Sequence, residues 1–231
     1  MAYEGYKYSF KNQFRTMASL TVYRTGRQQC TADYMRGREV RDFYLIHYVI
    51  KGSGTYILNG ISYPVHEGQA FLIYPNMPIN YMADTEEPWE FCWVGFNGTD
   101  ARIMMNATAF TPQQPVITLR HPDQMLELML DIYTARGNLP HEIISMTAHL
   151  YTLISFLIQE NMGALPRRSR SSGDQVQHAC DYIAAHYASG ITVKEVAAHL
   201  GICRSQLYRI FMQTVSMSPQ KYLSEFRIRQ A

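Results

Sequence analysis

Residues 191–231 read ITVKEVAAHLGICRSQLYRIFMQTVSMSPQKYLSEFRIRQA, and this stretch decides the fold of the C-terminal part. Thr192 followed by Glu195 forms a capping box, which predicts the start of a helix. Gly201 then permits the left-handed conformation that ends this helix. Further helices are predicted by apolar residues that recur every three or four positions, at about 175–188, from about Cys203, and from Ser218-Pro219.

Two short helices joined by a tight turn form a helix–turn–helix, a unit that places its second helix in the major groove of DNA. In the second helix, Leu207, Ile210 and Phe211 make the buried stripe. The residues left facing outward are Arg204, Ser205, Gln206, Tyr208 and Arg209. The alternative is a small helical bundle with no role in DNA binding.

The segment from about Ala179 to Ala231 resembles the first half of the DNA-binding domain of the AraC/XylS family of transcriptional regulators. The resemblance is carried by DYIAAHYASGITVKEVAAHLGI, SQLYRIF and SPQKYLSEFRIRQA. It implies that Ser205, Tyr208 and Arg209 face DNA bases, with Arg204 and Gln206 beside them. In that family a second helix–turn–helix follows, joined by the helix that RIRQA begins, so the domain is expected to be incomplete in this chain. Cys203 stands where the family has a serine cap, and cysteine caps poorly.

Charge is distributed unevenly along the 231 residues. Residues 166–231 carry nine Lys/Arg and four Asp/Glu, whereas the first 165 residues carry twelve and fifteen. The basic end favours contact with DNA. The four cysteines show no paired spacing and are expected to be reduced thiols. The N-terminus has no apolar core of a signal peptide, and no apolar run approaches the length of a membrane span, so a cytoplasmic protein without a membrane partner is expected.

The N-terminal half is built of short apolar or alternating runs separated by turns, which favours a β-sandwich or small barrel. Asn59-Gly60 is a strong signal for a two-residue hairpin, and Pro64 suggests an edge strand or a bulge. The predicted strands are LIHYVI (45–50), TYIL (55–58), ISYPV (61–65), AFLIYP (70–75), MPINYM (77–82) and WEFCWVGF (89–96).

Residues of about 20–100 resemble the cupin-like sensor barrel of AraC-type sugar regulators, through KGSGTYILNGISYPVHEGQAFLIYPNMPINYMAD and EPWEFCWVGFNG. The resemblance implies a small effector, a sugar, in the barrel, with Trp93 at the position of a ligand-stacking tryptophan. Phe91 replaces a ligand-contacting histidine. Three arginines lie near the position of a ligand-binding arginine, namely Arg36, Arg38 and Arg41, of which Arg38 is preferred.

Trp89, Phe91 and Trp93 alternate along one strand face, as stacking on the C–H face of a sugar requires. Tyr81 and Tyr44 are further candidates for the pocket lining. The alternative for Trp93 and Phe91 is that they only fill the barrel. Catalytic cupins hold a metal with an HxH motif, whereas His47 and His66 are isolated in this sequence. We therefore expect no metal, no other cofactor and no catalytic residues.

Two predicted helices, 122–137 and 140–161, connect the halves. In the second, Ile143, Leu150 and Leu157 recur seven apart, and because the family pairs these helices across a dimer we expect a dimerisation segment. The alternative is that both helices pack only on their own barrel. Residues 165–173 are expected to be a flexible linker.

The sequence therefore predicts an α+β protein with a cupin-like β-barrel or jelly roll at 1–120, a helical dimerisation segment at 121–164, a linker at 165–173 and a helix–turn–helix subdomain at 174–231. The expected function is an AraC-family regulator of carbohydrate uptake and metabolism genes. Its expected partners are double-stranded DNA, a sugar effector, a second copy of the chain and RNA polymerase. The alternative is a ligand-binding and dimerisation protein, or a truncated remnant, without specific DNA binding.

Overall fold

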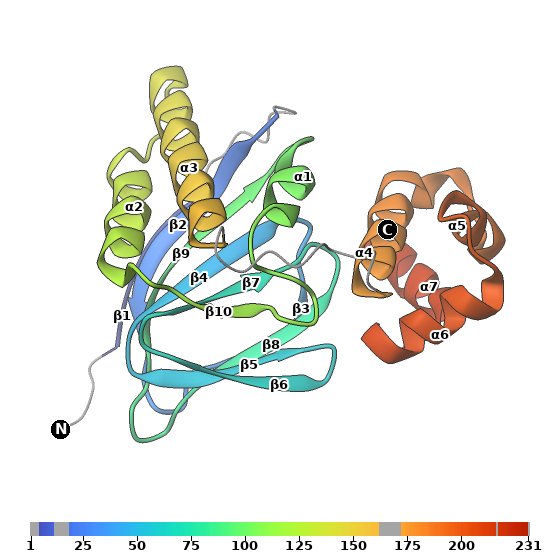
Figure 1. Ribbon diagram of the computed structural model, residues 1–231, viewed down its shortest axis with the longest axis horizontal. Helices are drawn as coiled ribbons and strands as arrows, with labels where there is room; N and C mark the ends of the chain where they lie inside the picture. Colours follow the sequence, from blue (N-terminus) through green and yellow to red (C-terminus); the bar gives the residue numbers. More distant parts are fainter. Residues whose placement is uncertain (1–4, 12–18, 162–171, 216, 231) are drawn as a thin grey trace.

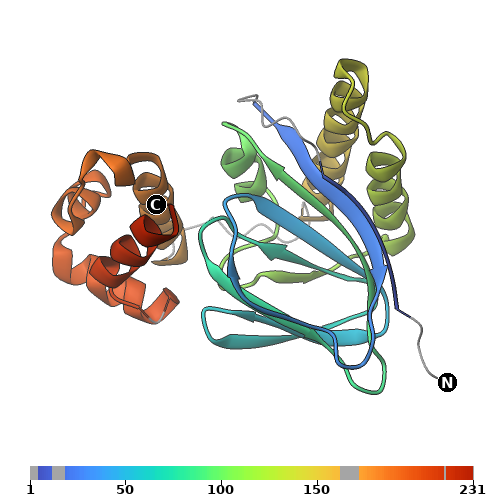
Figure 2. The ribbon, with the colours of Figure 1, turned by 180° about the vertical axis from the view of Figure 1, so that it is seen from behind.

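A β-barrel is followed by a separate bundle of short helices (Figure 1). The computed structural model describes residues 5–11, 19–161, 172–215 and 217–230. Figure 2 shows the same arrangement from behind, with the first strand lying along the second at the open side of the barrel. The predicted order, an α+β chain with the sheet first and the helices last, is confirmed.

Two antiparallel sheets face each other to form the barrel. The larger sheet has the order β1-β2-β9-β4-β7-β10, and the smaller has the order β3-β8-β5-β6. The strands are β1 Tyr6–Lys11, β2 Thr21–Gln29, β3 Met35–Val40, β4 Tyr44–Lys51, β5 Ser53–Leu58, β6 Ile61–His66, β7 Gln69–Ile73, β8 Pro78–Ala83, β9 Glu90–Asn97 and β10 Val116–Thr118. Each of the six strands predicted between residues 45 and 96 is present.

Local chemistry accounts for the turns of the smaller sheet. Asn59 and Gly60 both have positive φ, 54° and 82°, as a two-residue hairpin that matches the strand twist requires. This hairpin joins β5 to β6, whose register pairs Leu58 with Ile61. Pro64 lies in β6 at the edge of the sheet. An edge strand tolerates proline, which has no N–H to donate to a neighbouring strand.

Two helices cover the outer face of the larger sheet. They are α2 Pro122–Thr134 and α3 Pro140–Asn161, and they pack on each other and on β2, with α2 also touching β4 and β9 (Figure 1). A shorter helix, α1 Ala101–Asn106, follows β9. The side chains of α3 that enter the core are Met146, Leu150, Leu153, Ile154, Phe156 and Leu157.

The heptad positions of α3 pack into the core of their own domain. Leu150 and Leu157 are fully buried within their own domain, and Ile143 is half-buried against the same core. The prediction that Leu150 and Leu157 form dimer contacts is therefore wrong, because the barrel and α2 already cover the apolar stripe. Within the described residues, the stretch Pro140–Glu160 also has the length and mean hydropathy, 1.2, of a membrane span, which corrects the expectation that no run does. Helices in the core of a soluble protein can have the same length and mean hydropathy.

The C-terminal helices are α4 Ser172–His186, α5 Val193–His199, α6 Arg204–Val215 and α7 Pro219–Gln230, with a 3-10 turn at Tyr187–Ser189. The capping box of Thr192 and Glu195 is present, and Gly201 has φ of 66°. Ile228, near the end of α7, is 75% exposed. Of the predicted linker, 165–171 lies outside the described residues, and the remaining two residues already belong to α4.

Three of the four cysteines, Cys30, Cys92 and Cys180, are buried, and Cys203 is exposed. All four are free thiols. Burial raises the pKa of each of the three buried thiols to about 12, which keeps them protonated and unreactive at neutral pH.

Candidate functional site

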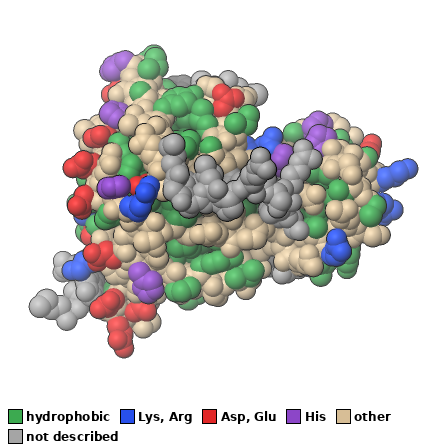
Figure 3. All heavy atoms as spheres, viewed as in Figure 1, with side chains coloured by type: hydrophobic (Ala, Val, Ile, Leu, Met, Phe, Trp, Pro, Cys, Tyr) green, Lys and Arg blue, Asp and Glu red, His purple; other side chains and the backbone are tan. Residues whose placement is uncertain are grey.

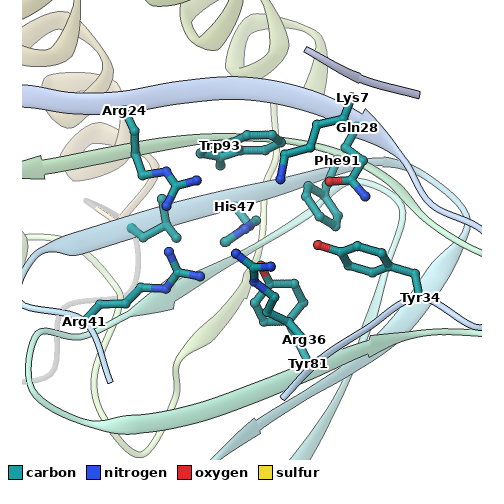
Figure 4. Close-up of a pocket in the computed structure, with 11 residues that line it drawn as sticks. Lys7, Arg24, Gln28, Tyr34, Arg36, Arg41, His47, Tyr81, Phe91 and Trp93 are labelled. Carbon is teal, nitrogen blue, oxygen red and sulfur yellow. The ribbon is translucent and has the colours of Figure 1, made fainter. Parts of the chain in front are cut away.

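A small pocket opens between the two sheets at one end of the barrel and measures about 270 Å³ with its open mouth included. Side chains from six strands of both sheets, and from the segments beside β3, point into it (Figure 4). The lining residues are Lys7, Arg24, Gln28, Tyr34, Arg36, Arg41, Leu45, His47, Tyr81, Phe91 and Trp93. The pocket thus combines aromatic rings with polar and cationic groups.

Trp93 forms one wall of the pocket because a glycine lies opposite it. Gly26 of β2 pairs with Trp93 of β9, and a Cβ on Gly26 would lie 2.4 Å from the indole ring. The glycine therefore leaves room for the ring to lie flat over β2. The Lys7 ammonium from β1 lies 5.6 Å from the centre of the same ring, within the range of a cation–π contact.

The predicted aromatic residues Phe91 and Tyr81 also line the pocket, as does His47. Their rings pack edge to face, with centroids of Phe91 and Tyr81 6.2 Å apart and those of His47 and Phe91 5.0 Å apart. Trp89 lies deeper, stacked on Phe71 in the core. Phe91 and Trp93 are both buried, so they fill the barrel and bound the pocket at once.

Tyr44 does not line the pocket, which contradicts the prediction. Leu45 and His47 of β4 point inward, and side chains alternate along a strand, so Tyr44 points to the other face. There its ring stacks on Phe96, with centroids 5.7 Å apart. The predicted residue is one position away from Leu45, which does line the pocket, and neighbouring side chains of a strand point to opposite faces of the sheet.

Four cationic side chains converge on the pocket (Figure 4). Arg36 and Arg41 were among the predicted arginines, whereas Lys7 and Arg24 were not identified. The preferred candidate, Arg38, belongs to β3, but its side chain is outside what the structure describes. Lys7 and Arg24 lie on β1 and β2, and only the strand register brings them beside Trp93, so no local sequence signal points to them.

The cations are only partly balanced by acidic groups. Glu39 lies 2.8 Å from Arg41 Nη2 and 3.2 Å from Arg36 Nε. The buried Nε atoms of Arg24 and Arg41 have no hydrogen-bond partner among the described residues. Burial, followed by repulsion from the neighbouring arginines, lowers the pKa of Lys7. The same two causes lower the pKa of Arg24 and hold that of His47 well below its usual range.

No group of three His, Cys, Asp or Glu residues in the described ranges could hold a metal ion. His47 is neutral because of its low pKa, and its ring stacks on Phe71 at a centroid distance of 4.6 Å. Its role is therefore packing and pocket lining. His66 lies at the end of β6 and is exposed.

A second candidate site is the exposed face of α6. Arg204, Ser205, Tyr208 and Arg209 are exposed, with Tyr208 at 53%, whereas Gln206 is half-buried. Leu207, Ile210 and Phe211 are buried as predicted. The predicted outward face is therefore present on the second helix of a helix–turn–helix. Figure 3 shows Lys and Arg side chains on the outer side of this domain, while acidic side chains gather on the far side of the barrel.

The two domains touch through a few polar contacts. The Tyr222 hydroxyl of α7 donates to the backbone oxygen of Asn76, in the turn between β7 and β8. Gln177 Nε2 of α4 donates to the Pro75 oxygen at 3.3 Å. Arg102 Nε of α1 lies 3.6 Å from Asp181 of α4, whose pKa is raised by burial.

A cupin-like barrel with a pocket, joined to a helix–turn–helix, is the architecture of a transcriptional regulator. Comparison with known families agrees. Residues 21–154 match the AraC-like ligand binding domain, and residues 183–224 match the bacterial regulatory helix-turn-helix proteins of the AraC family. The chain therefore belongs to the AraC family of transcriptional regulators, and it is not an enzyme.

Three similar proteins are operon regulators, and two of them are named for a sugar. The Msm operon regulatory protein of Streptococcus mutans is 27% identical over 92% of this chain and 77% of its own length. The raffinose operon transcriptional regulatory protein RafR of Pediococcus pentosaceus is 26% identical over 89% and 76%, respectively. The lactose operon transcription activator of Staphylococcus xylosus is 27% identical over 81% and 68%. Among solved structures, apo ToxT from Vibrio cholerae has the same fold, with a TM-score of 0.54 at 11% identity over 96% of this chain and 83% of that one.

Proposed function

We propose that the chain regulates genes of carbohydrate uptake and metabolism, and that a sugar bound in the barrel controls its binding to DNA. The observation that carries this proposal is the pocket itself, where the face of Trp93 borders several hydrogen-bonding groups. An aromatic face with a few convergent polar groups suits the alternating C–H and O–H surfaces of a sugar. The names of two of the similar regulators, which refer to raffinose and lactose, support the same class of effector.

The first half of α6 supplies the DNA-reading residues in this proposal. Arg209 would contact a base edge and Arg204 a phosphate, while Ser205, Gln206 and Tyr208 complete the face. The arginines at 167–170 lie outside the described residues and would add only phosphate attraction. No cofactor takes part.

A direct contact offers a route from the effector to the DNA-binding domain. The Arg41 side chain lines the pocket, and its backbone oxygen accepts a hydrogen bond from the Asn76 N–H. The Asn76 oxygen in turn accepts the Tyr222 hydroxyl. A shift of Arg41 on effector binding would therefore move the turn on which α7 rests.

The protein would act as a cytoplasmic homodimer that also contacts RNA polymerase. On α3, the exposed residues Ile144, Ala148, Tyr151 and Ser155 share one face, opposite to the buried stripe. Ile144 is 69% exposed. This exposed face of α3, rather than Leu150 and Leu157, is the surface that we assign to the dimer.

Selection from a pool of random DNA duplexes tests the proposal although the operator is unidentified. The purified chain should enrich one sequence pattern, and Arg209→Ala should relax that pattern at one or two positions. Lys221→Ala, an exposed substitution on α7, is the matched control and should leave the pattern unchanged. Addition of the effector should then change the affinity for the selected site. The alternative function, a ligand-binding protein without specific DNA binding, predicts effector binding but no enriched sequence.

A further inference from the structure

The pocket carries more positive charge than a neutral sugar requires. Lys7, Arg24, Arg36 and Arg41 face one small space, and Glu39 is the acidic residue that pairs with two of them. The site therefore holds an excess of three positive charges among the described residues. This observation deepens the proposed function, on which it rests, because it concerns the chemistry of the same effector.

Arg24, like Lys7, has no acidic partner among the described residues. Its Nε is buried without a hydrogen-bond partner, and no acidic side chain in the described ranges forms an ion pair with it. Arg27, on the opposite face of the same strand, does have a partner, Glu90 at 2.6 Å. A half-buried cation without a counter-charge, whose Nε also lacks a hydrogen bond, lowers the stability of the free protein.

A neutral hydroxyl offers a hydrogen bond to these groups but leaves their mutual repulsion in place. A phosphate group offers about two negative charges and three acceptor oxygens, and the planar guanidinium group matches its geometry. Figure 4 shows the Arg24, Arg41 and Lys7 head groups directed toward the same space, beside the ring of Trp93.

We propose that the effector is a phosphorylated monosaccharide, with its phosphate held by Arg24, Arg41 and Lys7 and its ring against Trp93. The Lys7 ammonium lies 5.6 Å from the centre of the Trp93 ring, so one ligand can reach both groups.

The first experiment can precede identification of the sugar, because inorganic phosphate is the probe. In phosphate buffer the unfolding midpoint of the unmodified chain should rise above that in sodium chloride of equal ionic strength. In Arg24→Gln this difference should disappear. Without phosphate, Arg24→Gln should itself melt higher by roughly 2–4 °C, since one uncompensated, half-buried charge is removed. Arg27→Gln, on the opposite face of β2, is the matched control and should keep the phosphate response.

The second experiment compares glucose, galactose, fructose and mannose with their 6-phosphates and with glucuronate, by calorimetric titration. At least one phosphorylated sugar should bind tenfold or more tightly than its neutral parent, and Arg24→Gln should remove that preference. Equal or tighter binding of the neutral parents would overturn the phosphate assignment while leaving the proposed sugar response intact. Tighter binding of glucuronate than of every sugar phosphate would also overturn it, in favour of a carboxylate. A response to inorganic phosphate alone would support the anion site and contradict the sugar response.

Discussion

At the scale of single residues, the pocket depends on the pairing of Gly26 with Trp93 across two strands. Trp93→Ala should weaken effector binding by about 1–3 kcal/mol, or roughly 5- to 150-fold, because the sugar loses the apolar face on which it stacks. Calorimetric titration with the effector measures this loss, and circular dichroism shows whether the barrel stays folded. Unchanged affinity in a folded variant would place the effector elsewhere.

The start of the DNA-reading helix is a second residue-scale feature. The sulfur of Cys203 accepts the Gln206 N–H at 3.4 Å, a weaker cap than an oxygen supplies. Cys203→Ser should therefore stabilise the C-terminal domain by about 0.5 kcal/mol.

Cys180→Ser provides the opposite control, because Cys180 is fully buried and a hydroxyl there replaces a well-packed thiol. Thermal unfolding should show a higher midpoint for Cys203→Ser and a lower midpoint for Cys180→Ser than for the unmodified chain. A lower midpoint for Cys203→Ser would mean that the sulfur caps the helix better than we infer.

At the scale of elements, the exposed face of α3 makes a testable distinction. Ile144→Glu should convert a dimer to a monomer with little change in the monomer's stability, within about 0.5 kcal/mol, since Ile144 is exposed. Leu150→Glu should instead unfold the domain, because it buries an unpaired charge. Sedimentation and thermal unfolding of both variants separate the two effects. An unmodified chain that sediments as a monomer at tens of micromolar would contradict the dimer.

The same helix shows what a sequence can and cannot predict about elements. The heptad of Leu150 and Leu157 marks an apolar stripe, but nothing in it says whether another chain or the chain's own barrel covers that stripe. The strands were predictable, because alternation and the Asn59-Gly60 turn are local signals. The pocket was only half predictable, because Arg24 reaches it through a strand register that no local pattern contains.

At the scale of the whole molecule, coupling between the domains is the property that distinguishes a regulator from a barrel joined to a DNA-binding unit. Hydrogen bonds are among the contacts that join the two domains, and the one that begins in the pocket passes from Arg41 through Asn76 to Tyr222. Such a link suits a regulator, since a ligand can shift the balance between two arrangements only by the difference in its binding energy for them.

Tyr222→Phe removes the hydroxyl of this link and keeps the ring, which packs against Phe211 with centroids 5.7 Å apart. We expect the effector to bind the variant with unchanged affinity in the absence of DNA. Its effect on DNA affinity should shrink by roughly 2- to 12-fold, the equivalent of one hydrogen bond of about 0.5–1.5 kcal/mol. Tyr187→Phe, whose ring packs on Phe226 within the C-terminal domain, is the matched control and should keep full coupling.

Both sides of the thermodynamic cycle can be measured, and this makes the test strict. Linkage requires that DNA change effector affinity by the same factor by which effector changes DNA affinity. Gel-shift titrations with and without effector give one factor, and effector titrations with and without the selected duplex give the other. If both factors fall together in Tyr222→Phe and remain full in Tyr187→Phe, the coupling runs through the Asn76 turn. If both stay at their unmodified values, the effector reaches α6 by another route, because the hydroxyl contact would then carry none of the coupling free energy.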